Sequence, residues 1–294
     1  MKPVRAPLYA PGINDRVMAK ALQSSADAVI LDLEDSVPIA SKSAARSLVA
    51  KAIAGAAAAT GPMIFVRTNS AATKLLADDL AAVVRPGLDA VMLPKVESVE
   101  EVQGLAEALD RLEVGAGMKP GTVAILLLIE SALGVYRCFE LIKSSLRVAG
   151  TCIGTARDGD LQTDLGCSWS LEGTELMYAR SKVLLDTRAA GPHVHPLDGV
   201  FSDLNDEAGL IQDSRLSARL GYIGRTVIHP KQIEPVRRAY AVPAADVAYY
   251  QKVVREFEAV EKSGAAAIAV DGKLVDYAMY ERAKRVLDLA KLDR

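Results

Sequence analysis

The stretch AILLLIE, residues 124–130, decides the fold, because a continuous apolar run ends there abruptly in a carboxylate. A strand that is apolar at every position is buried on both faces, which is typical of a parallel sheet. Glu130 would then lie at the carboxyl end of a buried strand. A carboxylate in that place needs a cationic partner or a metal ion.

Other short apolar runs share this character, and helical patterns such as those at 42–59, 99–113 and 172–191 separate them. The runs are PLYA (7–10), AVILDLE (28–34), MIFVRTN (63–69), AVMLPKV (90–96), VAGTCIGT (148–155), LDGVFSD (197–203) and GYIGRTVIHP (221–230). Strands that alternate with helices in this way predict an α/β fold, a TIM (β/α)8 barrel. The alternative is an open doubly wound sheet. Its dinucleotide-binding form is disfavoured, because no G-x-G-x-x-G follows the first strand.

The chain after Pro243 departs from this rhythm. It predicts a helix over 245–264, a hairpin over 267–275 with Asp271-Gly272 at its turn, and a last helix. We therefore predict a catalytic barrel over residues 1–240 and a C-terminal helical and hairpin appendage over residues 241–294.

Charge and composition exclude several classes of protein. The 294 residues carry 35 basic and 37 acidic side chains, which gives no sign of a nucleic-acid-binding face or a polybasic membrane patch. No run approaches the roughly 20 apolar residues that cross a bilayer. The first residues, MKPVRAPLYAPG, lack the apolar core of a signal peptide.

The cysteines are Cys138, Cys152 and Cys167. An odd number without paired spacing argues against a disulfide framework and against a cysteine zinc site. Cys152 is expected to be a small core residue. A cytoplasmic location is the simplest expectation.

Polar side chains gather where the predicted strands end, which is where a TIM barrel forms its active site. Charged residues also end strands because loops are solvated, and for any single residue this alternative stays open. Arg67 and Glu130 directly follow buried runs, which favours a functional role for both. The full set is Asp32, Glu34, Asp35, Arg67, Asn69, Lys95, Glu130, Arg157, Asp158, Asp160, Asp203, Asp206 and His229.

These residues favour a magnesium site. Mg²⁺ is usually held by one or two carboxylates, and its other positions go to substrate and water. Glu130 with Asp158 or Asp160 would supply such a pair. Zinc is disfavoured because it prefers His or Cys, and only His229 among the histidines lies at the carboxyl end of a predicted strand.

Several segments, in their order and spacing, resemble the citrate lyase β-subunit-like family within the HpcH/HpaI aldolase/citrate lyase superfamily. They include LYAPGINDRVMAKAL, AVILDLEDSVPIASKSAAR, FVRTN, AVMLPKVES, LLLIESALGV, GDLQTDLG and GVFSDLNDEAGL. The resemblance covers nearly the whole chain. It implies a Mg²⁺-dependent carbon–carbon lyase acting on a 3-hydroxyacyl-CoA thioester, such as malyl-CoA or citramalyl-CoA, with an acyl-CoA and a 2-oxo acid as products.

The resemblance also implies roles for individual residues. Glu130 and Asp160 match metal ligands, and Arg67 matches the arginine that binds the substrate carboxylate or carbonyl. The DLEDSV motif supplies acidic residues around the metal and its waters. In that motif we assign Asp32 to substrate binding and Glu34 to catalysis.

Basic residues in the chain match those near the coenzyme A phosphates of relatives. They are Lys42, Arg46 and Lys95; Lys42 and Arg46 could equally be an ordinary solvated helix face. Asp276 matches a C-terminal aspartate that acts in a neighbouring subunit's active site, which implies a homotrimer or a hexamer. Its alternative role is a helix N-cap.

The sequence departs from the family after the sixth strand, where it reads GTARDGDLQTDLG (154–166). Gly159 stands where relatives have glutamate and the loop is longer, so Asp158 is the alternative to Asp160 as second metal ligand.

Two other activities stay open. One is a class II aldolase that acts on free 2-oxo acids without CoA, and the other is a citrate lyase β subunit that acts on a carrier-bound citryl thioester.

Overall fold

The computed structural model describes residues 1–56, 61–261 and 267–293. The chain divides into two compact units, Met1–Ala239 and Tyr240–Arg294. No helix in the described residues combines the length and the apolar character needed to cross a membrane.

The first unit is a closed barrel of parallel strands in the order β1 to β8. Backbone hydrogen bonds close the barrel between the last and the first strand: the Tyr9 amide donates to the Val227 carbonyl at 2.8 Å, and the Val227 amide to the Pro7 carbonyl at 2.9 Å. The predicted TIM barrel is confirmed. The strands are β1 (Leu8–Pro11), β2 (Ala28–Asp32), β3 (Met63–Arg67), β4 (Ala90–Leu93), β5 (Ala124–Ile129), β6 (Val148–Ile153), β7 (His195–Asp198) and β8 (Gly224–Arg225).

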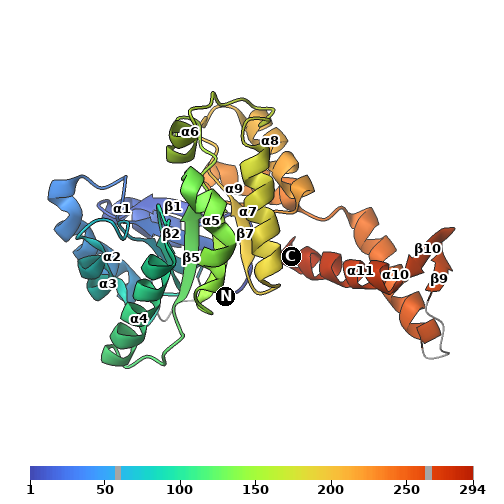
Figure 1. Ribbon diagram of the computed structural model, residues 1–294, viewed down its shortest axis with the longest axis horizontal. Helices are drawn as coiled ribbons and strands as arrows, with labels where there is room; N and C mark the ends of the chain where they lie inside the picture. The colour runs from blue at the N-terminus through green and yellow to red at the C-terminus, as the bar shows by residue number, and fades with distance from the viewer. Residues whose placement is uncertain (57–60, 262–266, 294) are drawn as a thin grey trace. The chain divides into compact units, whose positions relative to one another are not determined.

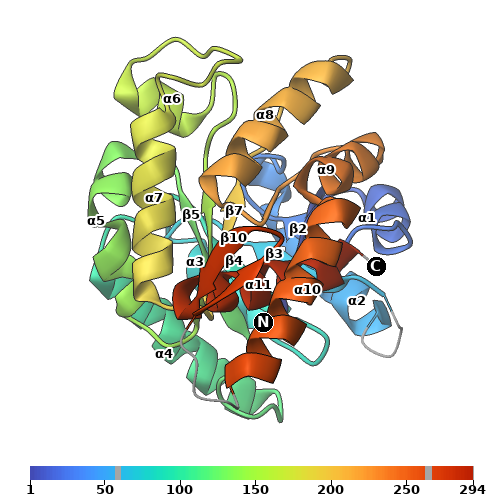
Figure 2. The same ribbon diagram turned by 90° about the vertical axis from the view of Figure 1, so that its right-hand side faces the viewer.

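Helices cover the outside of the strands, and α5 and α7 lie side by side in both views (Figure 1 and Figure 2). Side-chain caps fix where several of them begin. Ser131, directly after Glu130, accepts from the Gly134 amide at the start of α5, and Ser98 forms a capping box with Glu101 at the start of α4. The helices are α1 (Asp15–Leu22), α2 (Lys42–Ala56), α3 (Leu76–Val83), α4 (Val99–Gly115), α5 (Ala132–Lys143), α6 (Asp160–Leu165), α7 (Met177–Ala190), α8 (Glu207–Leu220) and α9 (Ile233–Tyr240).

The strands form the core of this unit. Every residue of β2, β4 and β6 is buried, as expected for strands covered on both faces. The last two strands differ from the sequence expectation: β7 begins at His195, and β8 has only two residues. After β8 the chain still forms backbone hydrogen bonds to the strands on either side. The Thr226 amide donates to the Asp198 carbonyl of β7, and the Val227 amide donates to the Pro7 carbonyl just before β1.

The second unit has a core of its own, built on Val253, Phe257, Val270 and Val275. It contains α10 (Ala244–Glu261), the antiparallel strands β9 (Ala267–Val270) and β10 (Lys273–Asp276), and α11 (Tyr277–Ala290). The predicted hairpin is confirmed. Asp271 and Gly272 have φ values of +49° and +76°, which suit the two central positions of a tight hairpin turn.

Candidate active site

A cavity of about 440 Å³ opens at the carboxyl ends of the barrel strands. This volume falls in the range of pockets that bind small molecules. The ends of β2, β3 and β5 and the loop after β6 supply its charged lining. The charged residues that line it are Asp32, Asp35, Arg67, Glu130 and Asp160.

Arg67 and Asp32 form a two-pronged ion pair at the wall of this cavity. The Arg67 Nε and Nη2 atoms donate to the two carboxylate oxygens of Asp32, each at 2.8 Å. Burial alone would raise the pKa of Asp32, but the hydrogen bonds and charge of Arg67 outweigh it and lower that pKa. The guanidinium also lies 5.0 Å from the centre of the Tyr9 ring. Asp32 is therefore a fixed anion that orients Arg67.

Glu34 lies between the two cations of the site. Its Oε2 is 3.0 Å from Arg67 Nη1, and its Oε1 accepts a hydrogen bond from Lys95 Nζ at 3.0 Å. Burial raises the pKa of Glu34, and the positive charge of Arg67 opposes this shift. A carboxylate whose pKa is raised by its surroundings suits proton transfer.

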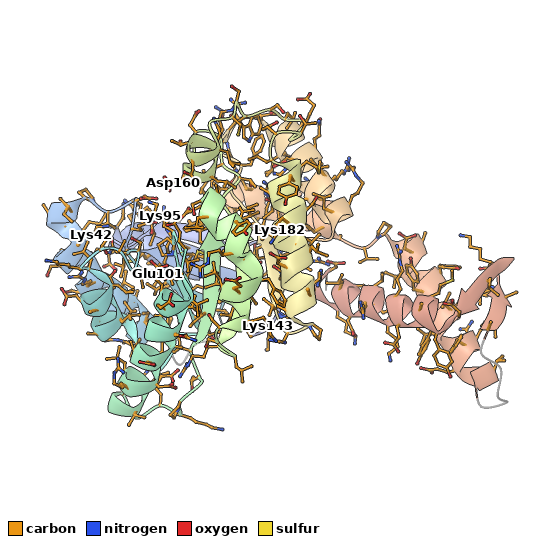
Figure 3. All side chains as sticks on the ribbon, in the orientation of Figure 1. Lys42, Lys95, Glu101, Lys143, Asp160 and Lys182 are labelled. Atoms are coloured by element: carbon orange, nitrogen blue, oxygen red, sulfur yellow. The ribbon has the colours of Figure 1, made fainter. Side chains whose placement is uncertain are left out.

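Lys95 joins several acidic groups. Its ammonium is 3.2 Å from Asp160 Oδ2 and 3.6 Å from Asp35 Oδ1, and Figure 3 shows Lys95 and Asp160 at the same end of the barrel. Partial burial would lower the pKa of Lys95, but the hydrogen bond and charge of Glu34, with help from Asp35 and Asp160, raise it. Lys95 therefore stays positively charged among these carboxylates.

Glu130 is 8% exposed and follows β5 directly. Its Oε1 accepts from the backbone amide of Lys95 at 3.0 Å. Burial, and next the negative charge of Glu34, raise the pKa of Glu130 to about 8. So high a pKa means that the surrounding residues do not supply enough positive charge to stabilise the ionised carboxylate. A bound cation would supply it.

The structure separates the two candidates for second metal ligand. Both side chains are exposed, but Asp160 lines the cavity, whereas Asp158 has a φ of +59° and is not among the lining residues. The backbone amide of Asp158 donates to Gln162 Oε1 at 2.8 Å. The geometry thus favours Asp160.

Lys42 and Arg46 do not form the solvated face that we considered. Lys42 is buried, and its ammonium donates to the carbonyls of Leu33 and Glu34, both at 2.7 Å. Arg46 donates to Asp79 at 2.7 Å. Lys42 thus braces the chain that follows β2, whereas Arg46 joins α2 to α3, and neither residue lines the cavity. Their contact with coenzyme phosphates stays a prediction.

Asp276 lies in the second unit, where it caps α11. Its exposed carboxylate accepts from the Met279 amide at 3.0 Å, so the N-cap role is present.

Two other strand-end residues have local roles as well. Asp206 accepts from the Gly209 amide at 2.8 Å, and the His229 ring accepts from the Lys231 amide at 3.1 Å.

Sequence reasoning missed the uncharged walls of the cavity, including Tyr9, Gly154, Thr155 and Thr226. It also missed a buried network behind them, in which Asp213 accepts from Arg180 at 2.8 Å and from Arg225 at 2.7 Å. The polar side chain of Tyr9 inside an apolar strand is the one signal that could have drawn attention to this wall.

Comparison with known proteins identifies the family of the chain. The family model described as HpcH/HpaI aldolase/citrate lyase matches residues 5–230. The chain belongs to this family. A model described as a C–C bond lyase of the TIM-barrel fold matches residues 182–292. The family resemblance seen in the sequence is confirmed, and the chain is an enzyme of a lyase family.

Similar proteins of this family cover almost the whole chain. Citrate lyase subunit beta of Escherichia coli K12 is 35% identical over 98% of this chain and 93% of its own length. Human mitochondrial citramalyl-CoA lyase is 28% identical over 98% of this chain and 86% of its own length. The crystal structure of protein CitE from Mycobacterium tuberculosis, in complex with magnesium, acetoacetate and coenzyme A, is 30% identical, covers 98% of both chains and has a TM-score of 0.74.

Gly154 makes room for Glu130 in this family member, because a Cβ built on Gly154 would lie 2.7 Å from the Glu130 Cβ. Replacing Gly154 with alanine is therefore expected to push Glu130 aside, weaken Mg²⁺ binding about tenfold and cost about 1–3 kcal/mol of unfolding free energy. Calorimetric metal titration and denaturant unfolding measure the two effects.

Gly104 on α4 is the matched control, because a Cβ there meets nothing within 4 Å. Gly104→Ala is expected to leave metal binding unchanged and to add up to about 1 kcal/mol of stability. Native metal affinity in the Gly154→Ala protein would contradict the steric argument.

Proposed function

We propose that the chain is a Mg²⁺-dependent carbon–carbon lyase. It cleaves or forms a 3-hydroxyacyl-CoA thioester such as malyl-CoA or citramalyl-CoA, with an acyl-CoA and a 2-oxo acid as products. The observation that carries the proposal is the buried Glu130 carboxylate, which shares a cavity with Asp160 and the Arg67 guanidinium. The magnesium, acetoacetate and coenzyme A of the similar CitE structure support the metal and the thioester.

Glu130 and Asp160 are the residues that would hold Mg²⁺. The described residues contain no group of three or more His, Cys, Asp or Glu side chains arranged to hold a metal. Two carboxylates, with the other positions left to substrate and water, fit Mg²⁺ better than a metal that needs a complete protein cage. When bound, the ion supplies a Lewis acid that polarises the carbonyl of the 2-oxo acid.

The side chains around this pair would carry the proton and charge transfers. In the cleavage direction, Glu34 takes the proton of the substrate's 3-hydroxyl group, and the C–C bond breaks to leave a 2-oxo acid and the enolate of the acyl-CoA. Arg67, held in place by Asp32, offsets the negative charge that develops. Asp276 of a neighbouring subunit then protonates the enolate carbon, which completes the acyl-CoA.

The assignment of Asp276 predicts that two inactive variants rescue each other. Glu130→Gln and Asp276→Asn are each expected to be inactive, whereas an oligomer mixed from both contains sites with an intact Glu130 and an intact Asp276. We expect random exchange of subunits in an equal mixture to restore about a quarter of the native activity. Asp288→Asn, at the exposed end of α11, is the control. Absence of rescue in verified mixed oligomers would contradict a shared site.

The pKa of Glu130 predicts how metal binding depends on pH. Below about pH 8 the metal-free carboxyl holds a proton, which must leave when Mg²⁺ binds. Affinity is therefore expected to fall about tenfold for each pH unit below this value and to level off above it. Calorimetry in buffers of different ionisation enthalpy should find about one proton released at about pH 6 and almost none at about pH 9. Proton release that is independent of pH would contradict the assignment.

A panel of thioesters tests the activity itself. Malyl-CoA, citramalyl-CoA and their free acids are incubated with Mg²⁺, and glyoxylate, pyruvate and free CoA are followed separately. Release of a 2-oxo acid from a CoA ester supports the proposal. Cleavage of the free acids alone would instead identify a class II aldolase.

A second candidate is the β subunit of a citrate lyase, which would act on a carrier-bound citryl thioester. The 35% identity to the Escherichia coli subunit favours it. Cleavage of citryl-carrier with no cleavage of any CoA ester would select this function.

For either activity we propose the cytoplasm as the location, because the free cysteines Cys138, Cys152 and Cys167 suit a reducing compartment.

A further inference from the structure

Lys95 contacts both of the proposed metal ligands, through different parts of the same residue. Its backbone has a φ of +52°, a conformation that side-chain-bearing residues rarely adopt. In that conformation the backbone amide donates to Glu130 Oε1 at 3.0 Å, while the ammonium lies 3.2 Å from Asp160 Oδ2. The main chain therefore orients one ligand, and the side chain neutralises the other.

The ammonium is the nearby positive charge for Asp160. Arg67, the other cation of the site, is engaged by both oxygens of Asp32 and by Glu34. Within the part of the chain that the structure describes, Asp160 forms its ion pair with Lys95. An Asp160 oxygen that binds a divalent ion cannot keep an ammonium at the same distance, because two cations a few ångströms apart repel each other.

We infer that the Lys95 ammonium is a resident counter-ion that Mg²⁺ displaces from Asp160. The inference rests on the proposed function, which makes Glu130 and Asp160 the metal ligands. The Lys95 side chain is 38% exposed and has a long flexible stem, so its ammonium can move away from Asp160 when the ion binds.

Metal titration without substrate tests the competition. Lys95→Met removes the ammonium and keeps the backbone amide that donates to Glu130. It is expected to bind Mg²⁺ about tenfold more tightly than the native protein, because no cation has to leave. Lys95→Arg keeps the charge and should bind about as the native protein does. Lys143→Met, at the exposed end of α5 and far from Asp160 in Figure 3, should change nothing. Unchanged or weaker binding by Lys95→Met overturns the inference.

Chemical labelling of lysines tests the displacement directly. The full-length protein is acetylated briefly with and without saturating Mg²⁺, and each lysine is quantified by mass spectrometry. Lys95 should react several-fold faster with Mg²⁺, whereas buried Lys42 stays slow and exposed Lys143 stays fast. Equal or slower labelling of Lys95 with Mg²⁺ overturns the inference.

These experiments separate this inference from the proposed function. Neither requires turnover, so a failed lyase assay leaves both results interpretable. If the native protein binds no Mg²⁺, the metal assignment and the inference fall together. If it binds Mg²⁺ and Lys95 responds in neither experiment, only the displacement is wrong.

Discussion

Replacing Glu130 with glutamine is expected to abolish lyase activity while making the metal-free protein more stable. The amide keeps the shape of the side chain but is a poor ligand for Mg²⁺, which prefers anionic oxygen. Lewis-acid stabilisation is worth several kcal/mol, so the rate should fall by about three orders of magnitude or more. Mg²⁺ binding should fall below detection in the same variant.

The stability gain has a defined dependence on pH. Burial raises the folded-state pKa of Glu130 to about 8. The folded protein therefore binds this proton more tightly than the unfolded chain does. The cost of ionising Glu130 is absent at low pH and grows as the pH rises from the unfolded-state pKa through the folded-state value. Glu130→Gln should thus melt like the native protein at about pH 4, and be a few kcal/mol more stable at about pH 9 in the absence of metal.

Glu100→Gln on the exposed surface of α4 is the matched control, with the same chemical change and native activity expected. Activity assays, metal titration and melting curves with and without Mg²⁺ provide the readouts. A Glu130→Gln protein that still cleaves its substrate with Mg²⁺ would show that the metal mechanism is wrong.

Replacing Arg67 with methionine is expected to damage both the fold and the reaction. Asp32 is 2% exposed and would lose the partner that binds both of its oxygens. Removing one member of a buried ion pair costs about 3–5 kcal/mol, because the other charge stays buried and uncompensated. Loss of a preorganised cation at the developing negative charge should also lower the rate about a hundred- to a thousandfold.

The double variant Arg67→Met, Asp32→Asn separates these two effects. Neutralising Asp32 removes the uncompensated charge, so much of the stability should return, whereas the catalytic cation is still absent. Arg111→Met on the exposed surface of α4 controls for the loss of an arginine. Recovery of activity along with stability in the double variant would show that Arg67 acts only as a structural partner.

The sequence predicted the parts of this site that depend on strand ends. A buried run that stops at a charged residue places Arg67 and Glu130 at the barrel mouth, because all parallel strands end there. The partners of Lys42 were not predictable in this way. Its ammonium bonds to the carbonyls of Leu33 and Glu34, and the path of the loop after β2 decides whether those carbonyls turn towards it.

The conformations of single loop residues were also beyond sequence reasoning. The choice between Asp158 and Asp160 depends on a left-handed residue and a short helix that follow β6. Likewise, nothing in AVMLPKV indicates the positive φ of Lys95. Gly154 looks like an ordinary glycine after a strand until the distance between its missing Cβ and Glu130 is known.

The separate core of residues 240–294 makes this part of the chain a module. Phe257 and Val275 belong to a core formed by residues of the second unit, so substitutions that keep this core can accumulate there while the carboxylates at the barrel's strand ends stay the same. Exchanging this segment between relatives would transplant Asp276 and its surroundings in one step. On the proposed mechanism, selection can thereby vary the residue that protonates the enolate independently of the metal site.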